Sequence, residues 1–228
     1  MDLTAKQRRT IEQVVNVFET GTPEGDYALI SIYEDGPGNA RQITYGRSQT
    51  TEYSKLRDLV ALYVRSGGLL SSELAGYVER IGVTPLTDDE EFKTLLQRAA
   101  REDVVMRQAQ DTFFDERYFQ PALEWARQNG FILPLSGLVI YDSYIHSGAI
   151  LDLLRERFSE LTPAMGGSEV DWLTAYVKVR HEWLSNHSRP ILRKTNYRTQ
   201  CLLGEIRRGN WNLDLLPIQV NGVDVWGE

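Results

Sequence analysis

Two carboxylates near the start of the chain, Glu19 and Asp35, have the side-chain type and the setting that glycosidic hydrolysis requires. Glu19 stands at the end of an expected helix and Asp35 at the end of an expected strand. Two carboxyl groups on facing elements, with a gap between them, can act as general acid and general base on a sugar polymer. Glu19 lies near the negative end of the helix dipole, which predicts a raised pKa. A general acid needs a shift in that direction.

More acidic and aromatic side chains crowd the same stretch. They are Glu24, Asp26, Tyr27, Tyr33, Glu34, Tyr45 and Glu52. Carboxylates flanked by aromatic rings suit a sugar polymer, and especially one that carries amines. The alternative is a solvated acidic surface, which is the usual state of clustered acids on a hairpin.

The elements that must position the two carboxylates follow from periodicity. Apolar residues at helical spacing predict a helix over residues 4–19, and Gly21 just beyond it is a stop signal. Alternation with a period of two predicts strands over 28–33 and 42–45, joined by turn residues at 36–39. Glu19 therefore closes the helix, and Asp35 closes the first arm of a hairpin.

The rest of the chain is predicted to be mostly helical. One long helix is expected over residues 103–129, with a break before Pro121, and another over 149–161, while a short strand pair is expected near 218–225. The segment 135–145 is nearly all apolar, which predicts a helix buried through the centre of a domain. Within it Asp142 and His146 lie one turn apart. They form either a polar strut that supports a cleft or a satisfied pair in the core.

Composition narrows the class of protein. The chain has 228 residues, a formal net charge of -7 and one cysteine. The charge argues weakly against a nucleic-acid partner and fits a cationic one, and general solubility is the alternative explanation of the same charge. The three histidines show no ligand spacing, so no metal or other cofactor is expected. No apolar run approaches the ~18 residues of a membrane span. The polar start lacks the apolar core of a signal peptide, which fits a cytoplasmic protein or a mature, separately exported form.

The segment SIYEDGPGNARQITYGRS resembles the small hairpin of the lysozyme superfamily, and the closer similarity is to chitosanases of glycoside hydrolase family forty-six. The signature of that family corresponds here to Glu19, Asp35, Gly46 and Glu52. Three later segments resemble the same family: IYDSYIHSG at Ile140–Gly148, TNYR at Thr195–Arg198 and NLDL at Asn212–Leu215. The similarity therefore covers nearly the whole chain.

The resemblance implies an inverting endo-hydrolase of β-1,4-linked glucosamine polymer. Glu19 would protonate the leaving oxygen, Asp35 would activate a water on the opposite face of the ring, and Thr44 would orient that water. The resemblance also implies an extracellular protein whose partner is a chitosan oligomer, and we expect a monomer.

The remaining candidate site residues are expected to bind substrate. Glu52 would hold a substrate ammonium by a charge-assisted contact. Tyr27, Arg41 and Gly46 complete this set.

The resemblance also fixes the expected architecture. Residues 1–228 would form one mainly α, α+β, lysozyme-like domain of two lobes, with the small antiparallel hairpin in a minor lobe of about residues 20–60. Glu19 and Asp35 would lie on opposite walls of the cleft. Two alternatives keep this fold: a lysozyme-like hydrolase of peptidoglycan or chitin, and a saccharide-binding module without catalysis.

Overall fold

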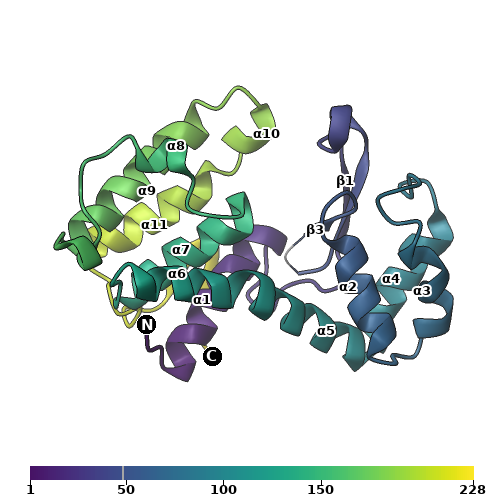
Figure 1. The fold of residues 1–228 in the computed structure, drawn as a ribbon. Helices are drawn as coiled ribbons and strands as arrows, with labels where there is room; N and C mark the ends of the chain where they lie inside the picture. The colour runs from purple at the N-terminus through teal and green to yellow at the C-terminus, as the bar shows by residue number, and fades with distance from the viewer. Residues whose placement is uncertain (48) are drawn as a thin grey trace. The chain divides into compact units, whose positions relative to one another are not determined.

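The computed structural model describes residues 1–47 and 49–228, which divide into two compact units. Unit 1 combines residues 1–24 with 117–228, and unit 2 consists of residues 25–116. Both units are mainly helical (Figure 1). Each also carries a small antiparallel sheet. The predicted fold class is confirmed. The unit with the hairpin is larger than the segment of about residues 20–60 expected for a minor lobe.

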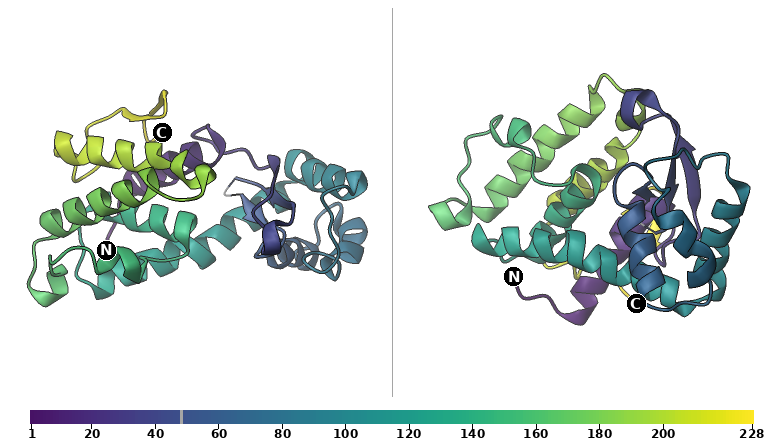
Figure 2. Two further views of the ribbon diagram at one scale, coloured as in Figure 1. Left: turned by 90° about the horizontal axis from the view of Figure 1, so that it is seen from above. Right: turned by 45° about the vertical axis from the view of Figure 1, so that its right-hand side comes forward.

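Unit 1 contains the first helix of the chain and everything from the middle of the sequence onward. Its elements are α1 (Ala5–Thr20), α6 (Gln120–Gln128), α7 (Pro134–Ser147), α8 (Asp152–Arg155), α9 (Glu169–Ser185), α10 (Pro190–Arg193), α11 (Asn196–Arg208), β4 (Ile218–Val220) and β5 (Val223–Val225). The helices α9 and α11 pack side by side (Figures 1 and 2). The helix predicted over 149–161 is wrong, because only the single turn of α8 forms there. The strand pair predicted near 218–225 is confirmed as β4 and β5.

The helix α7 is the buried centre of unit 1. Every residue from Pro134 to Ser143 is buried, as the apolar run predicted. Next to it, the fully buried ring of Trp172 contacts the rings of Phe131 and Tyr176 at centroid distances of 4.9 and 5.2 Å. This close packing leaves little freedom to the polar side chains that α7 and its neighbours carry.

The first helix is fixed at both of its ends. Thr4 and Gln7 form a reciprocal capping box at the start, and Gly21 ends the helix with a left-handed φ of 79°. Gln13, inside the helix, donates through Nε2 to the main-chain oxygen of Glu228 at 2.8 Å. Glu19 lies in the last turn of this anchored helix, as predicted.

Unit 2 contains a three-stranded sheet and several helices. Its elements are β1 (Ile30–Tyr33), β2 (Gln42–Tyr45), β3 (Thr50–Thr51), α2 (Leu56–Arg65), α3 (Ser71–Val78), α4 (Glu90–Glu102) and α5 (Val104–Phe114). The strand order is β1-β2-β3, and Ile30 pairs with Tyr45 in antiparallel register. The two predicted strands are confirmed, with β1 two residues shorter than expected, and β3 is an addition. A single 3-10 turn, Pro37–Asn39, connects the arms.

The helix predicted over residues 103–129 is interrupted, as expected, before Pro121. A π-helical segment, Asp115–Phe119, separates α5 from α6, and Pro121 lies in the first turn of α6. Proline is tolerated there because the first turn has no intrahelical partner for its missing N–H.

Gly46, which follows β2, is required by backbone shape and by space. Its φ is 82°, in the left-handed region, and its N–H donates to the carbonyl of Leu29 at 2.9 Å. A Cβ at this position would collide with Oε1 of Gln110. That amide bridges the main chain by accepting from the N–H of Arg47 at 3.1 Å and donating to the carbonyl of Tyr27 at 2.9 Å.

We predict that Gly46→Ala lowers the free energy of unfolding by about 2–4 kcal/mol, because it adds a collision to the left-handed strain. Gly38→Ala is the matched control, since Gly38 also has a positive φ of 64° but open space around its Cα. It should cost only about 1–2 kcal/mol. Urea unfolding measures both, and equal losses would contradict the collision with Gln110.

Candidate functional site

Glu19 is held from the side by an arginine of a distant helix. The guanidinium of Arg198, on α11, donates through Nη1 to Oε1 of Glu19 at 2.6 Å. Only 13% of the Glu19 side chain is exposed, and 3% of the Arg198 side chain. A charge-assisted bond between two nearly buried groups fixes the direction of the carboxyl.

Behind Glu19 the network continues into the core through Asp142 of α7. Arg198 donates through Nε and Nη2 to Oδ1 of Asp142, at 2.9 and 2.6 Å. Arg180 of α9 donates through Nη1 to Oδ2 of the same carboxylate at 2.5 Å. Asp142 and Arg180 are fully buried. Three helices thus contribute one charged group each to the support of the Glu19 carboxyl.

The pKa values follow from burial and from these ion pairs. Burial raises the pKa of Glu19 above its ordinary value of 4.5, and the Arg198 ion pair opposes this rise without cancelling it. The direction agrees with the sequence prediction, but its main cause is burial. For Asp142, burial would raise the pKa, but Arg198 and Arg180 outweigh it and bring the pKa to about 2. Asp142 is therefore a permanent carboxylate.

The side chain of His146 is not the hydrogen-bonding partner of Asp142. The carboxylate of Asp142 is occupied by the two arginines, and the ring of His146 lies at hydrogen-bonding distance from Ser147, 3.5 Å away. Burial, with the nearby Arg198 and Arg180, pushes the pKa of His146 well below 6.5. The histidine is therefore neutral at physiological pH.

Tyr197 holds the main chain just before Glu19, and Arg198 holds the side chain of Glu19. Its hydroxyl donates to the carbonyl of Phe18 at 2.5 Å, and the two rings meet edge to face at 6.0 Å. This carbonyl belongs to the last turn of α1, where helix carbonyls lack intrahelical donors. It also begins the peptide that leads into Glu19, so neighbouring residues of α11 fix the backbone and the carboxyl of that residue.

Asp35 lies in unit 2, just after β1, and is partly exposed. Its Oδ1 accepts a hydrogen bond from Nε2 of Gln42, the first residue of β2, at 2.8 Å. The hairpin thus orients this carboxylate through a side chain of the facing strand, while part of it remains in contact with solvent.

Two predicted site residues of unit 2 are occupied by structural contacts. The Glu52 carboxylate is 1% exposed and accepts from the N–H groups of Ile43 and Leu86, at 3.1 and 2.8 Å. It joins β2 to the loop before α4 and is not accessible to a substrate ammonium. Thr44 is buried, and its hydroxyl lies 3.1 Å from the carbonyl of Ser31 and 2.9 Å from Oε1 of Gln49. That hydroxyl is already engaged, so we do not assign it to a catalytic water.

The remaining predicted residues are accessible or shape the backbone. Tyr27 donates to Oδ1 of Asp111 at 2.8 Å, and Arg47 pairs with the same carboxylate at 3.0 Å. Arg41 is exposed and forms an ion pair with Asp88 at 3.2 Å. Gly46 acts through backbone shape, as described above.

Sequence reasoning missed three residues that build the site: Arg180, Arg198 and Tyr197. Two signals were available: the TNYR segment, which contains Tyr197 and Arg198, and the rule that a buried carboxylate needs a partner. The rule required a partner for Asp142, but it could not indicate which of the chain's arginines would supply it.

Within residues 1–47 and 49–228, no group of three or more His, Cys, Asp or Glu side chains could hold a metal ion. Over the same residues, none of the helices combines the length and apolarity needed to cross a membrane.

Comparison with known proteins places the chain in a family. Residues 13–218 match glycosyl hydrolase family 46. The chitosanase of Bacillus subtilis strain 168 is 26% identical over 230 residues, which span 93% of this chain and 81% of that protein. The chain belongs to glycosyl hydrolase family 46, and is a glycoside hydrolase.

Solved structures agree with this assignment. A chitosanase of this family from Gynuella sunshinyii, in complex with chitotetraose, is 26% identical and superposes with a TM-score of 0.84 over 98% of each chain. The native chitosanase of Bacillus subtilis MY002, at 24% identity, shares the fold with a TM-score of 0.82, over 99% of this chain and 100% of that one.

We predict that Asp142→Asn lowers the free energy of unfolding by about 3–5 kcal/mol at neutral pH, because it removes the counter-charge of buried Arg180 and one of the two carboxylates that pair with Arg198. Asp88→Asn, which breaks the exposed pair with Arg41, is the control and should cost about 0–1 kcal/mol. The pKa of about 2 also predicts that the stabilisation by Asp142 is present above pH 4 and is lost as the pH falls through about 2. Denaturant unfolding of both variants at pH 7 measures the two losses in free energy of unfolding. Similar losses in the two variants would contradict the buried network.

Proposed function

We propose that this chain hydrolyses the β-1,4 linkages of chitosan within the polymer, with inversion at the anomeric carbon. Glu19 is the general acid and Asp35 the general base. The observation that carries the proposal is the Glu19 carboxyl itself, which is nearly buried, has a raised pKa and is fixed by a buried arginine. Membership of a glycoside hydrolase family supports the reaction class.

The role of Glu19 follows from how its two oxygens differ. Arg198 donates to Oε1, so the proton of the neutral carboxyl belongs on Oε2, the oxygen that can give it to a leaving group. The raised pKa keeps the acid protonated at a higher pH than an ordinary glutamic acid. When the proton leaves, the carboxylate forms beside a guanidinium that stabilises it, which lowers the cost of the transfer.

The role of Asp35 rests on its different environment. It is partly exposed and oriented by the amide of Gln42, so it can meet a water molecule while its direction is set. Inverting glycosidases pair an acid of raised pKa with a carboxylate base that activates such a water. The two carboxylates thus divide the work by environment.

The choice of substrate rests on relatives and on charge. The curated relative is a chitosanase, and the similar Gynuella protein holds chitotetraose. The net charge of -7 favours association with a polymer of ammonium-bearing sugars.

The decisive experiment measures reducing ends released from chitosan by the wild type and by Glu19→Gln. Loss of the acid should lower kcat by about 10²–10⁴-fold. Glu12→Gln, on the same helix, removes a pair with Arg8 outside the site and is the matched control. NMR of the first product should show the α-anomer, because inversion converts a β linkage. Unchanged turnover in Glu19→Gln would refute the proposed acid.

The same assay separates the alternatives. Turnover of peptidoglycan or chitin, without turnover of chitosan, would establish a lysozyme-like specificity. Binding of glucosamine oligomers by the wild type with no release of reducing ends would establish a binding module.

We further predict that Tyr197→Phe lowers kcat by about 3–10-fold, a loss of roughly one hydrogen bond, with little change in KM. Without the hydroxyl that bonds the Phe18 carbonyl, the end of α1 loosens and water reaches the Glu19 carboxyl. Its pKa then falls, so activity is lost at a lower pH on the basic side of the profile. The measurement is kcat against pH, with Tyr77→Phe in α3 as the control. If the basic limb of the kcat–pH profile does not shift in Tyr197→Phe, Tyr197 contributes only to packing and does not set the pKa of Glu19.

A further inference from the structure

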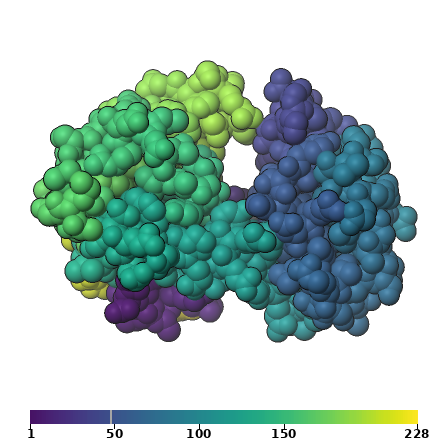
Figure 3. Space-filling model, viewed as in Figure 1, coloured from purple at the N-terminus to yellow at the C-terminus, as the bar shows by residue number. Residues whose placement is uncertain are grey.

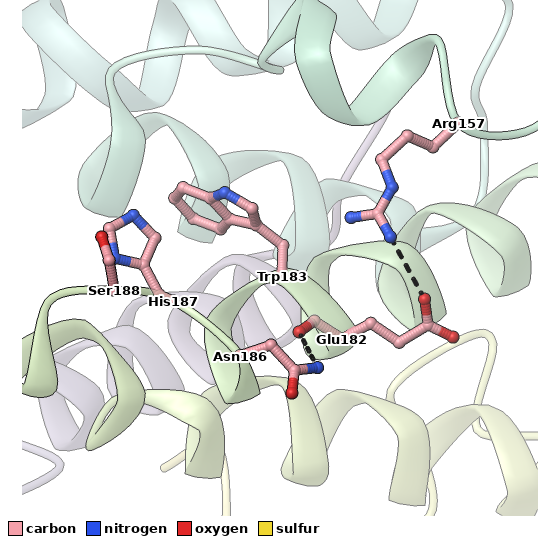
Figure 4. Close-up of a pocket in the computed structure, with 6 residues that line it drawn as sticks. All are labelled: Arg157, Glu182, Trp183, Asn186, His187 and Ser188. Carbon is pink, nitrogen blue, oxygen red and sulfur yellow. Dashed lines mark hydrogen bonds and ion pairs between the residues drawn. The ribbon is translucent and has the colours of Figure 1, made fainter.

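A second site candidate lies on unit 1, at the end of α9. A pocket of about 410 Å³ is lined by Arg157, Glu182, Trp183, Asn186, His187 and Ser188 (Figure 4). None of these residues belongs to the network around Glu19. The segments that carry the pocket, around α8, α9 and α10, form part of the outer surface of unit 1 (Figure 3). Its volume falls in the range of about 300–1,000 Å³ that is usual for small-molecule sites.

An aromatic ring stands in the middle of this pocket. The indole of Trp183 projects from α9 between His187 on one side and the Arg157–Glu182 pair on the other (Figure 4). The rings of Trp183 and His187 meet edge to face, with centroids 4.9 Å apart and planes at 88°. The indole is only partly buried, so some of its surface remains available to a ligand.

The turn after α9 is held rigid, which preorganises the pocket. The guanidinium of Arg193 donates to the carbonyls of His187 and Ser188 at 2.7 and 3.1 Å. The N–H of Arg189 donates to Nδ1 of His187 at 3.0 Å. The neutral imidazole therefore carries its proton on Nε2, where it can donate to a ligand.

Hydrogen-bonding groups of both kinds surround the ring. Asn186 donates through Nδ2 to the main-chain oxygen of Glu182 at 2.9 Å, which leaves its Oδ1 as an acceptor. Glu182 and Arg157 pair at 3.4 Å, with 64% and 43% of their side chains exposed. An ion pair this exposed contributes little, so the carboxylate can also accept from a second cation.

We propose that this pocket binds one amino-sugar residue of a polymer chain, separately from Glu19. The apolar face of a pyranose packs on Trp183, His187 and Asn186 bond its hydroxyl groups, and Glu182 takes the ammonium. The choice of an amino sugar rests on the proposed function. The pairing of an aromatic face with donors and acceptors is the independent structural argument.

The test uses the full chain with Glu19→Gln, which is expected to slow hydrolysis, and observes the indole N–H signals of its five tryptophans by NMR. Loss of one signal in Trp183→Phe assigns that of Trp183. Glucosamine trimer should shift the Trp183 signal saturably. Glu182→Gln should weaken this binding, but should leave binding of the uncharged N-acetylglucosamine trimer unchanged. A Trp183 signal that stays still while the trimer shifts other signals would overturn the proposal.

A matched pair of variants extends the test to the polymer. Trp183→Leu should weaken chitosan binding by about 3–10-fold in calorimetry. Trp226→Leu, at a tryptophan that is 51% exposed but outside the pocket, should leave it unchanged. Equal losses would overturn the site. The indole shift does not depend on turnover, so a wild type without chitosan hydrolysis would refute the proposed function and leave this site standing.

Discussion

The structure depends on one buried cation, the guanidinium of Arg198, which two carboxylates share. Burial of an arginine costs several kcal/mol unless it is fully paired, and here Glu19 and Asp142 provide the pairing. Arg180 adds a second buried cation. With Glu19 protonated, the cluster carries one excess positive charge, and with Glu19 ionised it is neutral. Burial of the Glu19 carboxyl favours its protonated form. The surplus positive charge of the two arginines opposes this and favours release of the proton.

This electrostatic balance depends on the fixed positions of the four charged side chains. Glu19 comes from α1, Asp142 from α7, Arg180 from α9 and the Tyr197–Arg198 pair from α11. The core between these helices is packed with fully buried aromatic rings such as Trp172 and Tyr176, and such an interior resists small displacements. Asp35, in contrast, is aimed by a single amide on a hairpin and keeps its contact with solvent. In the proposed mechanism the acid needs a rigid, dry setting, and the base needs access to water.

Much of the fold and part of the site could be predicted from the sequence. Periodicity located α1, its end at Gly21, the hairpin and the buried α7, because these features depend on neighbouring residues. It could not identify Arg198 or Arg180 as partners of Asp142, since helical spacing assigns a residue to a face and does not reveal which distant side chain meets it. For Glu52 the sequence predicted a contact with substrate that the structure does not support. Its place in a family signature suggested contact with substrate, whereas its carboxylate caps main-chain N–H groups in the interior.

The distance along the chain between the acid and its arginine has a consequence for biosynthesis. Glu19 and Arg198 are 179 positions apart, so a ribosome that adds about 5–20 residues per second completes the second roughly 10–40 seconds after the first. Until then unit 1 lacks the residues that bury Glu19, and the side chain on the nascent chain is an ordinary solvated glutamate. If Glu19 acts as proposed, catalytic competence is acquired late in translation, when α11 docks and sets the acidity of a residue made near the start.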